Sequence, residues 1–168
     1  GCYGSTKLKT PSIDQLAREG TRFTQAYSGS PVCAPSRCVL LTGLHTGHAR
    51  IRDNSPVVGG ELEKFAGGAE GGIRLSLKAE DRTVGELLKA AGYVTGYIGK
   101  WHLGDDAWYP QHQGFDVNRG GCDYGQPPSY FDPYSNKKLE GIPHLPPRKQ
   151  GEYLTEREAD EAVKFIRA

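Results

Sequence analysis

The amino-acid sequence predicts an α/β fold, on two observations. First, a helix that begins at a T-x-x-E capping box, Thr83 and Glu86, ends at Gly92 and leads directly into the β-rich run YVTGYIG at 93–99. Second, such a tight helix-to-strand connection is typical of α/β sheets, which place ligands just beyond the C-terminal ends of their strands. The 168 residues are enough for one domain with a buried core.

The N-terminal segment predicts one helix and one strand. Residues 10–20 fit a helix, with Thr10 at the N-cap and Gly20 just past its end. Residues 22–27 are typical of a short strand that runs into a polar loop. The buried stripe of the helix is expected to comprise Ile13, Leu16 and Ala17.

The middle of the chain combines one short helix with long loops. Pro35 breaks the preceding structure, so a helix is expected over 36–42. Residues 52–80 are rich in glycine and poor in periodic apolar positions, which predicts a long surface loop. Residues 105–150 hold most of the Pro, Tyr and Trp and predict a structured loop over a cleft.

The last segment predicts a helix that starts at a second capping box, formed by Thr155 and Glu158. Its periodicity, like that of the helix at 83–92, places apolar residues on one face. Those faces are Val84, Leu87, Leu88 and Ala91 in the first helix, and Ala159, Ala162, Val163 and Ile166 in the second.

Charge and hydropathy exclude several classes of partner. The 21 Lys and Arg residues balance 20 Asp and Glu residues, so there is no charge excess to drive nucleic-acid binding. No apolar run approaches the roughly 20 residues that a membrane span needs. The four cysteines lack the paired spacing of a zinc ribbon and the density of a disulfide scaffold.

The segment from Cys33 to Arg37 carries the densest chemical signal. A cysteine at a helix N-terminus, with an arginine four positions on, sits in a positive field that lowers the thiol pKa and favours anions. A buried cysteine in a turn is an equally good interpretation of the local pattern. A phosphatase cysteine loop is excluded, because it needs five residues between Cys and Arg and only three stand here.

A second candidate lies just beyond the predicted strand at 93–99, in the sequence GKWHLG. Alternation along a strand-like segment places Lys100 and His102 on one face, as joint contact with one anion requires. Taken alone, a surface lysine and a histidine that caps backbone groups are the commoner arrangement.

These two segments resemble the signatures of a known family. The C-x-P-S-R core at 33–37 and the following LTG, together with G-K-W-H-L-G at 99–104, are similar to the type I, formylglycine-dependent sulfatases of the alkaline-phosphatase-like superfamily. Further likenesses are GCYG at the start, TPSIDQLAREG, HQGFD and the closing YLTEREADEAVKFI, so the resemblance covers essentially the whole chain and is nearest to arylsulfatases. It implies an α/β/α sandwich of the alkaline-phosphatase and sulfatase type.

The resemblance also implies a modified residue and a metal. In the family an activating enzyme oxidises the cysteine to formylglycine, whose hydrate attacks the sulfur of a sulfate ester. Cys33 would be that precursor and, once modified, a ligand of a divalent cation, most often Ca²⁺. The expected substrate is a sulfated aryl or carbohydrate alcohol, and export to the periplasm or the medium is expected.

By motif position, three residues besides Cys33 take roles in the site. Arg37 resembles the residue that holds the hydrated formylglycine, and Lys100 the one that contacts a sulfate oxygen. His102 resembles the histidine that hydrogen-bonds the diol and assists proton movement. His112 is a further candidate at the substrate entrance, with a structural turn as the alternative.

The family pattern is only partly present. An Asp-Asp pair that precedes the GCYG-like segment, and an Asp-Asn pair, a Lys and a His far downstream, have no counterpart, and the Asp105-Asp106 pair follows the second signature instead. We therefore expect residues 1–168 to be an N-terminal part of a sulfatase domain, without its first strand, C-terminal part and remaining metal ligands, and inactive alone. The alternatives are a phosphoester or phosphonate hydrolase of the superfamily and a non-catalytic domain that binds sulfated ligands.

Overall fold

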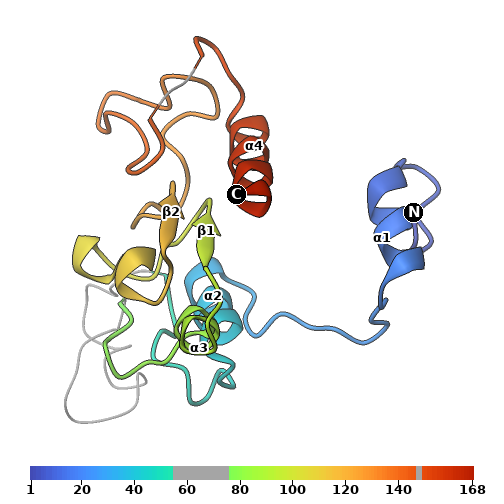
Figure 1. The fold of residues 1–168 in the computed structure, drawn as a ribbon, viewed down its shortest axis with the longest axis horizontal. Coiled ribbons are helices and arrows are strands. Elements are labelled where there is room, and N and C mark those ends of the chain that lie inside the picture. The colour runs from blue at the N-terminus through green and yellow to red at the C-terminus, as the bar shows by residue number, and fades with distance from the viewer. Residues whose placement is uncertain (55–75, 147–148) are drawn as a thin grey trace.

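The computed structural model describes residues 1–54, 76–146 and 149–168. The predicted α/β character is confirmed by a parallel pair of strands, β1 (Gly96–Ile98) and β2 (Val117–Arg119), in which Gly96 lies opposite Val117. Helix α4 (Leu154–Arg167) packs beside β1, whereas α2 (Cys33–Thr42) and α3 (Val84–Ala90) lie near its other end (Figure 1). The approach of α4 requires a glycine, because a Cβ on Gly96 would lie 2.9 Å from the Phe165 ring.

The core lies between the two strands and α2, and aromatic rings fill its centre. Trp101 is fully buried, and its ring meets that of Tyr97 edge to face at 4.9 Å between centroids. Phe115 contacts both rings in the same manner. Gly85 of α3 lies against the Phe115 ring, where a Cβ would come within 2.8 Å. Helix α3 therefore docks through a residue without a side chain.

The predicted capping box of α3 is confirmed. Thr83 Oγ1 accepts a hydrogen bond from the Glu86 amide, and the Glu86 carboxylate accepts one from the Thr83 amide. Thr83 is fully buried, and its hydroxyl also donates to the Gln113 carbonyl oxygen, 2.6 Å away. The box thus joins α3 to the connection between the two strands, which contains the 3-10 helices η2 (Asp106–Trp108) and η3 (Pro110–His112).

Several expected boundaries are wrong. Residues 22–27 form no strand, because they lie in an extended connection that no other described strand pairs with. Helix α2 begins at Cys33 rather than at residue 36, since a proline is tolerated in the first turn of a helix. Strand β2 falls inside the predicted loop 105–150, where its short Val-Asn-Arg sequence carries little β signal. Most of the predicted loop 52–80 lies outside the described residues.

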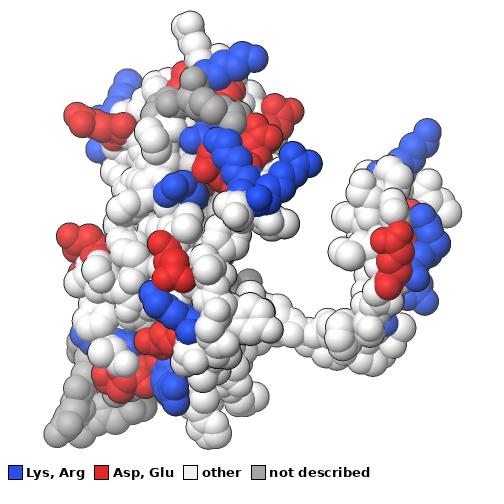
Figure 2. Space-filling view, viewed as in Figure 1, with Lys and Arg blue, Asp and Glu red and all other residues white. Residues whose placement is uncertain are grey.

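Helix α4 starts differently from the prediction. Tyr153, not Thr155, is its N-cap residue, and the cap makes no side-chain hydrogen bond, so the second capping box is wrong. The helix buries Leu154 together with Arg157 and Glu161, which form an ion pair. Lys164 and Arg119 also pair with Glu161, and Figure 2 shows acidic and basic side chains side by side over α4. The buried face is therefore partly ionic.

The apolar stripes expected from helical periodicity remain largely exposed. Helix α1 (Pro11–Glu19) has the predicted bounds but lies away from the other elements, and it buries no residue (Figure 1). Thr10 is its N-cap residue, yet the Thr10 hydroxyl donates to Asp14 instead of capping an amide. The large exposed apolar side chains of these stripes are Ile13, Leu16, Val84, Leu87, Leu88, Val163 and Ile166.

Candidate active site

The N-terminus of α2 holds Cys33 as its first residue. The preceding Val32 is extended and offers no side-chain cap, so the first amides of the helix need another acceptor. Asn54 supplies it, because its Oδ1 atom accepts a hydrogen bond of 2.8 Å from the Ala34 amide. The Cys33 side chain therefore lies at the positive end of the helix dipole.

The segment after β1 is turned by two residues in the left-handed region. Gly99 has a φ of +95° and His102 a φ of +59°, which is uncommon for a residue with a side chain. Trp101 between them is fully buried, and the His102 amide donates to the Cys122 carbonyl oxygen over 2.9 Å. Lys100 and His102 thus flank the buried Trp101 within a turn. The strand alternation expected from the sequence does not place them.

The side chains of both segments meet at Cys33. The Nδ1 atom of His102 lies 3.5 Å from the Cys33 sulfur, and the Nδ2 atom of Asn54 lies 3.1 Å from it. Partial burial alone would raise the pKa of Cys33. A hydrogen bond and the charge of Lys100, with hydrogen bonds from Asn54 and the Ala34 amide, outweigh burial and bring the pKa below its ordinary value.

Arg37 lies behind this cluster, one turn along α2 from Cys33. Its Nη1 atom donates to the Tyr97 hydroxyl at 3.0 Å and to the Lys100 carbonyl oxygen at 2.5 Å. Burial, followed by the positive charges of Lys100 and Arg37, lowers the pKa of His102. The neutral imidazole is favoured, so the site combines two fixed cations with a group able to accept a proton.

The whole chain, residues 1–168, matches the family model described as Sulfatase. The chain belongs to the sulfatase family. Human arylsulfatase D is 38% identical over 76% of this chain, and human N-acetylgalactosamine-6-sulfatase is 35% identical over 85% of it. The sulfatase chain spans about a quarter of these relatives, 23% and 26% of their lengths.

Solved structures support the same fold. The crystal structure of Ps i-CgsB is 28% identical to this sulfatase chain, with a TM-score of 0.68, and the match covers 97% of this chain and 37% of the other. The same match is found for Ps i-CgsB in complex with k-i-k-neocarrahexaose. The expected sulfatase fold class is therefore confirmed.

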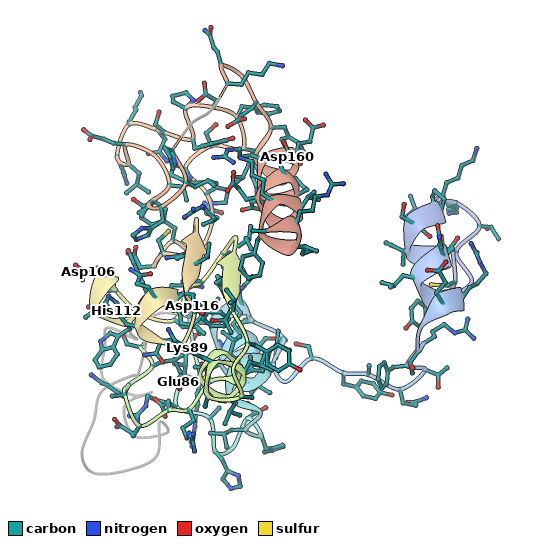
Figure 3. The ribbon with its side chains drawn as sticks, viewed as in Figure 1. Glu86, Lys89, Asp106, His112, Asp116 and Asp160 are labelled. Carbon is teal, nitrogen blue, oxygen red and sulfur yellow. The ribbon has the colours of Figure 1, made fainter. Side chains whose placement is uncertain are left out.

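Of the site residues expected from the sequence, Cys33, Lys100 and His102 come together, and Arg37 supports them. His112 lies apart from this cluster, exposed at the end of η3 (Figure 3). Asn54 was missed, because an asparagine at the edge of a glycine-rich stretch is typical of turns. Its only sequence signal is its position just after the alternating buried residues Ala49 and Ile51.

The donors around Cys33 suit an anion rather than a cation. Lys100, Arg37 and Asn54 present nitrogen atoms, whereas Ca²⁺ takes six to eight oxygen ligands. Within residues 1–54, 76–146 and 149–168, no three His, Cys, Asp or Glu side chains are grouped closely enough to hold a metal ion. The described residues around Cys33 therefore suit an anion and do not form a calcium shell. In the same residues, no helix has the length and apolarity to cross a bilayer.

Proposed function

We propose that the protein hydrolyses sulfate esters of aryl or carbohydrate alcohols, with Cys33 as the precursor of formylglycine. The observation that carries this proposal is the convergence of Lys100, His102 and Asn54 on Cys33, in a chain of the sulfatase family. A helix N-terminus with fixed positive charges stabilises the negative charge of a bound sulfate ester. It also stabilises the additional negative charge that develops in the transition state.

Each side chain has a distinct task in this proposal. The formylglycine hydrate would supply one hydroxyl oxygen that bonds to sulfur while the S–O bond to the alcohol breaks and the alcohol leaves. Loss of a proton from the second hydroxyl would then expel sulfate and restore the aldehyde. Lys100 places its ammonium charge against a sulfate oxygen. His102, kept neutral by its surroundings, accepts a proton at the Nδ1 atom, which lies 3.5 Å from the side chain of residue 33. Arg37 adds charge and holds the Lys100 backbone through its carbonyl oxygen.

A divalent cation, with Ca²⁺ as the family expectation, also belongs to the proposed enzyme. Its oxygen ligands would have to come from outside the described residues. The remaining proposed partner is a formylglycine-generating enzyme that acts on Cys33. Export to the periplasm or the medium is part of the same proposal.

The decisive experiment is peptide mass spectrometry of the full-length protein, produced with and without the activating enzyme. Trypsin releases residues 23–37, in which Cys33 is the only cysteine. We expect an aldehyde at Cys33 that reacts with a hydrazide probe, only when the activating enzyme is present. A Cys38→Ala variant should be modified equally well. An unmodified Cys33 thiol under these conditions would overturn the sulfatase proposal.

Activity assays separate the two alternatives. The modified protein should hydrolyse 4-nitrophenyl sulfate in preference to 4-nitrophenyl phosphate. A preference for the phosphate would favour a phosphoester hydrolase. Modification without turnover of any sulfate ester, with retained binding of sulfated oligosaccharides, would favour a binding domain.

A further inference from the structure

Asn54 contacts α2 at its first two residues, although it lies 20 residues after Ala34 in the chain. Its Oδ1 atom accepts from the Ala34 amide at 2.8 Å, and its Nδ2 atom donates to the Cys33 sulfur at 3.1 Å. The distance to Oδ1 is within the normal range for an N–H···O hydrogen bond. One side chain therefore joins the helix backbone to the side chain of residue 33.

The segment that carries Asn54 is anchored along the side of α2. Ala49 and Ile51 are buried in the core. Between them, Arg50 pairs with Asp81. Burial raises the pKa of the Cys38 thiol, and hydrogen bonds from the backbone of Ile51 and Arg50 partly oppose that rise. The segment thus passes the middle of α2 before it reaches the N-terminus, so Asn54 is delivered by packed neighbours.

The orientation of the Asn54 amide follows from its partners. The Ala34 amide can only donate, so the atom facing it must be the acceptor Oδ1. The Nδ2 group is then directed at residue 33 with a hydrogen to donate. The Asn54 backbone is held as well, since its amide donates to the Asp53 carboxylate at 2.6 Å. If donor and acceptor exchanged places, the contact with the Ala34 amide would be lost.

We propose that Asn54 is a positioning residue, which holds the side chain of residue 33 toward Lys100 and His102. Asn54 caps the helix that Val32 leaves uncapped, and it uses the same amide to direct the reactive group. In the unmodified protein the Nδ2 hydrogen stabilises the Cys33 thiolate. After modification the same hydrogen is available to an oxygen at position 33, and this second role rests on the proposed function.

Two substitutions separate the positioning role from a structural one. Asn54→Asp keeps the size and the acceptor for the Ala34 amide, but it removes the donor and adds a negative charge. Asn54→Ala removes both contacts. If Asn54 only caps α2, N54A should leave the pKa of Cys33 at its wild-type value, and any rise in N54D should come from its added charge. If Asn54 positions residue 33, N54A should be impaired as well as N54D.

The first readout is the pH profile of Cys33 alkylation in the full-length protein made without the activating enzyme. Iodoacetamide labelling of Cys33 is followed by mass spectrometry of its tryptic peptide. We expect the midpoint to rise by roughly one pH unit in N54A, the effect of losing one hydrogen bond to a charged group, and by more in N54D. Asn136→Asp makes the same chemical change on an exposed loop and should leave the profile unchanged. An unchanged midpoint in N54A would overturn the inference, whatever the charged N54D shows.

The second readout is kinetic and uses the modified enzyme. Rates on 4-nitrophenyl sulfate, expressed per formylglycine, should show a kcat about 10-fold lower in N54A with KM changed less than twofold. A kcat equal to that of the wild type would contradict the positioning role. If the wild type itself carries no aldehyde and no sulfatase activity, the proposed function fails, whereas the alkylation profile still decides the role of Asn54 toward Cys33.

Discussion

Arg37 on α2 donates a hydrogen bond to the backbone carbonyl oxygen of Lys100, 63 residues later in the chain, over 2.5 Å. The Tyr97 hydroxyl donates to the same oxygen at 2.6 Å and accepts from Arg37 at 3.0 Å. This triangle ties the end of β1 to the helix that carries Cys33. The distance between the two halves of the candidate site is therefore set by one guanidinium group.

Arg37→Lys should separate the two halves. A lysine cannot span both partners with the planar geometry of arginine, so the Lys100 backbone loses a charged hydrogen bond. We expect the free energy of unfolding to fall by about 2 kcal/mol and kcat/KM on an aryl sulfate to fall about 100-fold per formylglycine. Urea unfolding and steady-state kinetics measure the two effects. Arg18→Lys, at the exposed end of α1, is the control, and equal behaviour of the two variants would contradict this view.

Cys33 and Cys38 should differ in what their loss affects. Cys33→Ala removes the proposed precursor and should abolish sulfatase activity, with a change in unfolding free energy within about 0.5 kcal/mol. Cys38 is fully buried in the core, so Cys38→Ala should cost about 1 kcal/mol of stability and keep the activity per folded molecule. Thermal melting and aryl sulfate turnover test both. Equal loss of activity in the two variants would show that the nucleophile lies elsewhere.

Gly114→Ala should be strongly destabilising. Gly114 has a φ of +87°, and a Cβ there would lie 2.2 Å from the backbone nitrogen of Glu86, within the capping box of α3. Because a backbone atom cannot swing aside, we expect a loss of about 3 kcal/mol or more. Gly43→Ala is the matched control, since Gly43 has a φ of +68° with nothing within 4 Å and should cost about 1 kcal/mol. Chemical denaturation measures the free energy of unfolding of both variants. An equal loss in the two would mean that α3 can shift to make room for the Cβ.

Asp116 should make stability depend on pH in the acid range. Lys89 faces Asp116 across 2.6 Å (Figure 3). Hydrogen bonds from Lys89, then from the amide and hydroxyl of Thr95, lower the pKa of Asp116 to about 2. The native carboxyl binds fewer protons than the unfolded one below about pH 4, so its contribution is present above that pH and is lost as pH falls toward 2.

Asp116→Asn should therefore flatten the loss of stability between pH 4 and pH 2, as measured by urea unfolding at each pH. Lys89→Gln removes the leading cause and should raise the Asp116 pKa toward its ordinary value in a carboxyl NMR titration. If both variants lose stability between pH 4 and pH 2 as the wild type does, other carboxylates cause that loss.

Local signals predicted the parts of this structure that neighbouring residues decide. The capping box at Thr83 and the end of α2 at Gly43 depend on contacts within a few residues, and both were predicted correctly. The second box at Thr155 has the same T-x-x-E pattern, but α4 begins two residues earlier, where Tyr153 pairs with Phe131. A capping motif thus indicates a helix start only where the tertiary path allows it.

The site was predicted through its two signature segments and not through its geometry. Cys33, Lys100 and His102 follow from the motifs, but the turn at His102 and the contact from Asn54 depend on partners 20 or more residues away. The prediction that the apolar faces of α1, α3 and α4 are buried is wrong for a related reason. Periodicity shows which side of a helix is apolar, and only the tertiary packing shows whether that side is covered.

The single buried residue between Lys100 and His102 has a consequence for engineering. Trp101 contacts Tyr97 and Phe115 and donates its indole hydrogen to the Trp108 carbonyl oxygen, so it cannot shift without moving both polar neighbours. A substitution at Trp101 would therefore displace the lysine and the histidine together. Directed libraries are better placed at Gln126, which lines a pocket together with Lys100 and does not belong to the buried aromatic core.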